Sequence, residues 1–95
     1  MTQEINAIRE QILPLLKEAG VLRSALFGSV ARGEAGSGSD IDILIELPKD
    51  KSMFDLIELE EKIGKKLNKK IDLVTYRSLH HLLRDKILSE QVSIL

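Results

Sequence analysis

Three aspartates have the residue type and spacing for a metal-dependent reaction. Asp40 and Asp42 stand at the head of the apolar run 41–47, and Asp72 lies in a second apolar run, 71–76. Strand side chains alternate between faces, so Asp40 and Asp42 would share a face with their Cα atoms about 7 Å apart. Carboxylates about 5 Å apart repel by roughly 3 kcal/mol at an effective dielectric constant of about 20. A divalent cation is a natural counter-charge, because hard cations prefer carboxylate oxygens.

The third carboxylate would complete this site if the two apolar runs form neighbouring strands. Asp72 would then join Asp40 and Asp42 in one cluster. Three carboxylates without histidine or cysteine suit Mg²⁺, with Mn²⁺ as an alternative, better than zinc. Magnesium usually shares its coordination with substrate phosphates, so the cluster predicts half of a nucleotide site.

A Gly-Ser pair, Gly28 and Ser29, could form the other half. The pair follows the apolar run 21–27 and would begin a short helix, where free backbone N–H groups attract phosphate. Gly28 would let a phosphate approach the backbone, and the Ser29 hydroxyl could donate a further hydrogen bond. Arg32, one turn further on, could add positive charge beside a polyphosphate.

Together these residues fit an in-line displacement at phosphorus. Asp40 and Asp42 would hold two metal ions, which clamp the attacking and leaving oxygens. Asp72 would complete the first ion's site and help the incoming hydroxyl lose its proton, while pyrophosphate leaves toward Gly28 and Ser29. Each feature alone has a simpler explanation, as a strand-ending turn, a turn cap or a solvated residue on an edge strand. Their conjunction favours the chemical interpretation.

Strands that could carry these residues alternate with helices along the chain. Three runs have the composition of strands, at 21–27, 41–47 and 71–76. A short helix is expected from Ser29, and the Gly- and Ser-rich segment 35–39 is expected to be a loop. The tail 92–95 either adds an edge strand or is loose. We therefore expect a single α/β (α+β) domain whose sheet is covered by helices on one face.

The first helix is expected over residues 2–19, where apolar residues recur three and four positions apart. Thr2 is the expected N-cap and Gly20 the expected end. Pro14 lies inside this pattern and removes a backbone hydrogen bond, so it predicts a kink or a break.

Two later helices carry recognisable start signals. Ser52 and Asp55 resemble a capping box, and Ser78 is the expected cap of the last helix. The apolar residues expected to face the core from these helices are Leu56, Leu59, Ile63 and Leu67 in the first, and Leu79, Leu82, Leu83 and Ile87 in the second.

The composition is that of an ordinary globular domain. Hydrophobic residues make up 43% of the 95 residues and the net charge is −1, so neither a membrane partner nor direct nucleic-acid binding is expected. The absence of cysteine excludes thiolate sites and disulfides. Adjacent His80 and His81 would point in different directions on a helix and make a poor metal pair. No targeting signal is recognised, so a cytoplasmic location is the default expectation.

The quoted residues resemble a known superfamily. The runs "FGSVARGEA" and "SDIDILI", followed by "KIDLVTY", resemble the DNA polymerase beta-like nucleotidyltransferases. The closest likeness is to the minimal nucleotidyltransferase (MNT) family, in which valine is usual where this chain has Ile45. The resemblance covers nearly the whole chain, so residues 1–95 are interpreted as a minimal nucleotidyltransferase domain. It implies a mixed sheet of three or four strands flanked by helices, with the carboxylates on its open face.

The same resemblance implies a function. Gly28 and Ser29 would contact a nucleoside triphosphate, and Asp40, Asp42 and Asp72 would bind magnesium. MNT proteins are similar in role to antitoxins that transfer AMP from ATP to a tyrosine of a HEPN-domain ribonuclease toxin, which would be the partner here. Larger relatives carry a second domain, so we expect a partner subunit or a homodimer to complete the site.

Two alternatives stay open at the level of sequence. A non-catalytic antitoxin would neutralise its partner by binding alone, although the presence of all three aspartates favours an active enzyme. A small-molecule nucleotidyltransferase would need a substrate-binding domain, for which the chain has no recognisable segment. The acceptor, the preferred triphosphate and the oligomeric state are not encoded in any motif.

Overall fold

The computed structural model describes residues 3–34 and 40–95. Its elements follow the chain in the order α1 (Gln3–Glu18), β1 (Arg23–Phe27), α2 (Gly28–Ala31), β2 (Ile41–Glu46), α3 (Met53–Leu67), β3 (Ile71–Thr75), the 3₁₀ turn η1 (Tyr76–Ser78), α4 (His81–Glu90) and β4 (Val92–Ser93). Among these helices, none is long and apolar enough to cross a membrane. The expected N-cap Thr2 and the expected loop 35–39 lie outside the described residues.

The four strands form one mixed sheet in the order β3-β2-β1-β4. β1 pairs antiparallel with β2 and with β4, while β2 pairs parallel with β3 through the α3 crossover. The expected small mixed sheet is thus confirmed, and the tail supplies the edge strand. β2, which carries Asp42, and β1, which leads into the Gly-Ser pair, lie in the middle of the sheet, while β3 with Asp72 lies at one edge.

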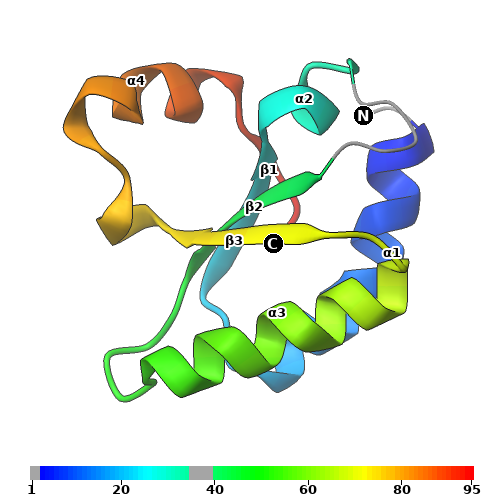
Figure 1. Cartoon of the computed structure of the whole chain (residues 1–95), viewed down its shortest axis with the longest axis vertical. Coiled ribbons are helices and arrows are strands. Elements are labelled where there is room, and N and C mark those ends of the chain that lie inside the picture. Colours follow the sequence, from blue (N-terminus) through cyan, green and yellow to red (C-terminus); the bar gives the residue numbers. More distant parts are fainter. Residues whose placement is uncertain (1–2, 35–39) are drawn as a thin grey trace.

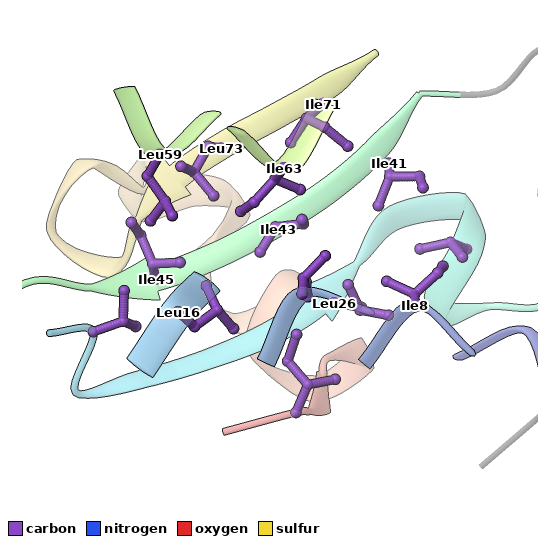
Figure 2. Close-up of a cluster of buried hydrophobic side chains, with 14 of the residues drawn as sticks. Ile8, Leu16, Leu26, Ile41, Ile43, Ile45, Leu59, Ile63, Ile71 and Leu73 are labelled. Atoms are coloured by element: carbon purple, nitrogen blue, oxygen red, sulfur yellow. The ribbon is translucent and has the colours of Figure 1, made fainter. Parts of the chain in front are cut away.

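The larger core fills the space between the sheet and the helices α1 and α3, which lie together at the right and bottom of Figure 1. Alternate residues of β2 point into it, namely Ile41, Ile43 and Ile45, each at most 3% exposed. Figure 2 shows these side chains meeting Leu16 of α1 and Leu59 and Ile63 of α3. This packing holds β2 rigidly from one side, which fixes the direction of the side chains on its other face.

The other face of the sheet is partly covered too, which corrects the expectation of helices on one face only. Ala25, Leu44 and Tyr76 form a smaller buried cluster, against which Phe27, Val74, Leu79, Ile87 and Leu88 pack. Four of these residues, Tyr76, Leu79, Ile87 and Leu88, come from the segment of η1 and α4 at the left of Figure 1. Leu44, which alternation places on the same face as Asp42, is fully buried because η1 and α4 cover this part of the sheet.

Helix ends follow the sequence signals in part. Gly20 has φ +79° and ends α1, with Val21 N–H donating to Leu16 at 3.0 Å. The capping box of Ser52 and Asp55 is present at the start of α3. Pro14 predicted a kink or a break, and there is no break, since α1 continues as one helix through it. Proline removes only one bond of the ladder, and the buried apolar face of α1 continues on both sides.

The start of the last helix was predicted wrongly. Ser78 lies in η1, where its hydroxyl donates to the Thr75 carbonyl oxygen. α4 begins at His81, and the His80 ring nitrogen accepts from Leu82 N–H instead. The helix therefore starts two residues later than expected, and Leu82 and Leu83, which were expected to face the core, are 76% and 54% exposed.

Candidate active site

Two of the three aspartates face each other across neighbouring strands. Asp42 of β2 and Asp72 of β3 are register partners in the parallel ladder, so their side chains leave the same face of the sheet. Ile41, Ile43, Ile71 and Leu73 point to the opposite side, into the large core. The apolar residues on either side of each aspartate therefore fix the two carboxylates on the face that α1 and α3 do not cover.

The environment of Asp42 disfavours its charge. Burial raises the pKa of this carboxyl, and the negative charges of Asp72 and Asp40 raise it further, while Arg32 acts in the opposite direction. On the other side Asp42 meets Phe27, its register partner on β1, whose ring also packs against the small cluster. Asp42 thus lies between an apolar ring and a like charge, which is a costly position for a residue with a purely structural role.

Gly28 lies directly against this carboxylate. Its φ is +71°, in the left-handed region that favours glycine, and a Cβ built there would overlap the Asp42 carboxylate oxygen. The sequence suggested that glycine lets a phosphate approach the backbone. The structure adds a second reason, since any larger residue at position 28 would push the Asp42 side chain out of place.

Ser29 is the second residue of α2 and is half-buried. α2 has four residues, so its macrodipole is small and attraction of an anion would rest on individual N–H and O–H donors. The backbone oxygen of Ser29 accepts from Glu34 N–H at 2.8 Å, which closes the turn after α2. Gly28 and Ser29 directly follow Phe27, the register partner of Asp42, so they lie at the same end of the sheet as the carboxylates.

Arg32 is engaged by two carboxylates. Its guanidinium Nε donates to Glu34 at 3.0 Å and its Nη1 donates to Glu90 of α4 at 3.2 Å. These hydrogen bonds raise the pKa of Arg32. The predicted contact with a polyphosphate would require the guanidinium to exchange at least one of these partners, which no sequence motif indicated because Glu90 is far away in the chain.

Asp40 lies just before β2 and is exposed, with Lys70 Nζ 3.9 Å from its Oδ2 atom. The Ile41 N–H donates to the Lys70 carbonyl at 3.0 Å, so the starts of β2 and β3 are tied together beside the carboxylates. Lys70 was not singled out from the sequence, where it closes an ordinary lysine-rich helix end. Its proximity depends on the parallel pairing of two strands that α3 separates in sequence.

The donor chemistry of this cluster fits magnesium, although the ligands are not drawn together. Among residues 3–34 and 40–95, no three carboxylate or imidazole side chains converge as a ready metal cluster. The carboxylates offer only hard oxygen atoms, as Mg²⁺ requires, and the like charges at Asp42 and Asp72 would be offset by a cation. A metal would have to draw Asp40 away from Lys70.

Comparison with known proteins gives a consistent set of relatives. The profile of the nucleotidyltransferase domain family matches residues 6–94. A candidate protein adenylyltransferase of Methanocaldococcus jannaschii is 46% identical over 91 residues, which are 96% of this chain and 98% of that protein. The protein adenylyltransferase MntA of Thermococcus cleftensis is 37% identical over 93 residues, which are 97% of this chain and 94% of that protein.

Solved structures with the same fold include two informative cases. A candidate minimal nucleotidyltransferase superposes with a TM-score of 0.83 at 34% identity, over 95% of this chain and 92% of that chain. A toxin–antitoxin crystal structure with AMP-PNP contains a chain that superposes with a TM-score of 0.80 at 26% identity, over 92% of this chain and 72% of that chain. The fold expected for a minimal nucleotidyltransferase is therefore confirmed.

Proposed function

Because this chain belongs to the nucleotidyltransferase domain family, we propose that it transfers AMP from ATP to a hydroxyl group of a partner protein. The acceptor we propose is a tyrosine of a HEPN-domain ribonuclease, for which the chain would act as antitoxin. The observation that carries the proposal is the register pairing of Asp42 with Asp72 beside Gly28. Two like charges on neighbouring strands, one of them held against a positive-φ glycine, are costly for the free fold and useful in phosphoryl chemistry.

Asp40, Asp42 and Asp72 would hold the magnesium. When bound, Mg²⁺ offsets the negative charge of the triphosphate and polarises the phosphorus that is attacked. The carboxylates are suited to this role because two of them are fixed by strands that the large core holds from behind. Asp40, which is exposed and only loosely paired with Lys70, is the ligand that can move on metal binding.

The reaction would be an in-line substitution at the α-phosphorus of ATP. The acceptor oxygen forms a bond to this phosphorus, the bond to the bridging oxygen of the β-phosphate breaks, and pyrophosphate leaves. Asp72 is exposed on the outer strand β3, so it can accept the proton of an incoming hydroxyl. The Ser29 hydroxyl and the N–H groups of α2 would donate to the departing phosphates.

The choice of a protein acceptor rests on relatives of this chain. The Methanocaldococcus and Thermococcus relatives share 46% and 37% of their aligned residues with it and are named for protein adenylylation. The toxin–antitoxin structure with AMP-PNP, at 26% identity, supports both an adenine nucleotide and a toxin as partner. The proposals that the partner is a HEPN-domain protein and that a tyrosine is the acceptor rest on the resemblance of the sequence to the MNT family.

The proposal is tested by following two labels of ATP. The chain, Mg²⁺ and the HEPN-domain partner are incubated with α-³²P-ATP or with γ-³²P-ATP, and the partner is then resolved by electrophoresis. AMP transfer predicts that only the α label appears on the partner, with pyrophosphate released in equal amount. Asp72→Asn should abolish the label, whereas Asp85→Asn, an exposed aspartate of α4, should leave it unchanged.

Two outcomes would overturn the enzymatic proposal. Label from γ-³²P-ATP on the partner would indicate phosphorylation instead of adenylylation. Full neutralisation of the partner's ribonuclease activity by Asp72→Asn, in the absence of any labelled partner, would leave a binding antitoxin as the function.

A further inference from the structure

A second feature of the described chain lies at the opposite end of β2 and β3 from the carboxylates. A cavity of about 450 Å³ opens there, between the β2–α3 connection and η1. Its floor is apolar and includes Leu22, Leu47 and Leu56. Asp42 and Glu46 are four residues apart on one strand, so about 13 Å separates the carboxylates from this cavity.

Apolar surface continues from the cavity onto α3. Leu22 and Met53 line the cavity and are 60% and 67% exposed. Phe54 and Ile57 follow on the first turns of α3, with 80% and 46% exposure. Residues three and four apart on a helix are neighbours, so Met53, Phe54 and Ile57 make one continuous patch. We call this cavity and its extension the α3 patch.

The charged side chains that line the cavity are mainly positive, whereas the α3 part of the patch is flanked by the carboxylates of Asp55, Glu58 and Glu61. Lys49, Lys51 and Arg77 line the cavity, and the carboxylate that does so, Glu46, is paired with Arg23 at 3.2 Å. Hydrogen bonds from Ser52 lower the pKa of Asp55, and the nearby positive charge of Lys51 lowers it further. None of the ion pairs within residues 3–34 and 40–95 involves Lys49 or Arg77. A complementary ligand would thus present carboxylates beside apolar side chains.

We propose that the α3 patch is the docking site for the partner protein, and that it binds an acidic, amphipathic segment of that partner. The proposal rests on the proposed function, since the partner is the protein that receives AMP. The apolar side chains of the segment would fill the cavity and cover Met53 and Phe54, while its carboxylates would pair with Lys49 and Arg77. Docking at the far end of the strands leaves the carboxylates open to ATP and to the acceptor hydroxyl.

The shape of the patch favours a protein segment over other occupants. A cavity of this volume falls in the range of about 300–1,000 Å³ usual for small ligands. A small molecule inside it would nevertheless leave Phe54 and Ile57 of α3 in water. A second copy docked through the same patch would place the cavity-lining Lys49, Lys51 and Arg77 of the two chains together. An acidic partner segment covers the apolar residues and meets the charges.

A crosslinking experiment locates the partner directly. The photoreactive residue p-benzoylphenylalanine is placed at position 54, or at position 82 of α4 as a control of similar exposure, 76% against 80%. The chain is co-expressed with the HEPN-domain partner and irradiated, and the crosslinked peptide is identified by mass spectrometry. We expect a crosslink from position 54 to a segment rich in aspartate or glutamate next to apolar residues, and little or none from position 82.

Substitutions then measure the contribution of each part. Met53→Asp should weaken partner binding about tenfold or more, as loss of a buried apolar anchor usually does. Lys49→Glu and Arg77→Glu should weaken it and reduce its dependence on salt, while Lys65→Glu at the other end of α3 should not. Binding is measured by isothermal titration, and thermal unfolding confirms that each exposed substitution leaves the fold intact.

The outcomes separate docking from catalysis. If partner binding and AMP transfer both survive Met53→Asp and Arg77→Glu, the docking proposal is overturned while the proposed function stands. If binding depends on the patch but no AMP is ever transferred, docking stands and the function falls. If the substitutions change the mass of the free chain in sedimentation instead, the patch joins two copies and the docking proposal is wrong.

Discussion

The two ends of β2 meet their neighbours in opposite ways on the same face of the sheet. At the start of the strand, Asp42 lies between Phe27 and another carboxylate, Asp72. At its end, Glu46 pairs with Arg23, whose guanidinium lies 3.9 Å from the centre of the Tyr76 ring. Glu46 at the end is thus neutralised by an ion pair within the chain, whereas Asp42 and Asp72 at the start take part in none of the ion pairs of the described residues, and the proposed magnesium or substrate would supply the opposite charge.

The largest expected difference between the two ends is in catalysis. Asp42→Asn removes a proposed metal ligand and should lower the rate of AMP transfer about 10²–10³-fold or more. Glu46→Gln makes the same acid-to-amide change at the ion-paired end of β2 and should leave the rate of AMP transfer within about twofold. Rates are measured with α-³²P-ATP at saturating Mg²⁺. Equal losses of the rate in Asp42→Asn and Glu46→Gln would show that the carboxylates at the start of β2 have no special chemical role.

A smaller but still substantial effect is expected at Gly28. Gly28→Ala places a Cβ against the Asp42 carboxylate in a backbone conformation with φ +71°. We expect a loss of about 2 kcal/mol in the free energy of unfolding, measured with urea. Gly33→Ala is the matched control, since Gly33 also has positive φ, +74°, but a Cβ there meets nothing within 4 Å. If both variants lose the same stability, the close approach to Asp42 contributes nothing.

The free energy of unfolding should also depend on the ionisation of the Asp42 carboxyl. The raised pKa of Asp42 means that the folded chain holds this proton more tightly than the unfolded chain does. Stability from this group is therefore lost as pH rises from its ordinary value of 3.8 through the raised folded value. Above that window and without divalent cations, Asp42→Asn should be more stable than the natural chain by about 1 kcal/mol, allowing for solvent screening.

Magnesium should reverse this ranking. Adding Mg²⁺ raises the midpoint of thermal unfolding of the natural chain but not that of Asp42→Asn, because a ligand stabilises the state that binds it. Calorimetry in EDTA measures the order of stabilities without metal, and calorimetry in Mg²⁺ measures the shift of each unfolding midpoint. An Asn variant that is less stable than the natural chain in EDTA at neutral pH would show that Arg32 already compensates the carboxylate.

The smallest effect is expected at the end of β2, where Glu46 pairs with Arg23. Glu46→Gln breaks an ion pair whose side chains are 52% and 42% exposed, so the change in the free energy of unfolding should be below about 1 kcal/mol. The change should shrink further in 1 M salt, because exposed pairs are screened. A loss much larger than this would mean that Arg23, Glu46 and Tyr76 act as one cooperative network.

Sequence patterns predicted the local structure well where a single residue decides it. The positive φ at Gly20 and the capping box of Ser52 follow from chemistry within one turn of a helix. Predictions failed where two local signals competed. Pro14 predicted a kink or a break in α1 and no break occurs, and Ser78 was expected to cap the last helix but His80 caps it instead. The roles of Gly28, Ser29, Arg32 and the three aspartates stay predictions.

The sequence by itself determined which residues could act at phosphorus and which face of each strand they would leave, because alternation along a strand needs only neighbours in the chain. Tertiary structure alone decided which of them meet. The parallel pairing of β2 with β3 brings Asp42 beside Asp72, and the return of α4 brings Glu90 to Arg32 across 58 residues of chain. Such contacts depend on the packing of the whole core, and no local periodicity encodes them.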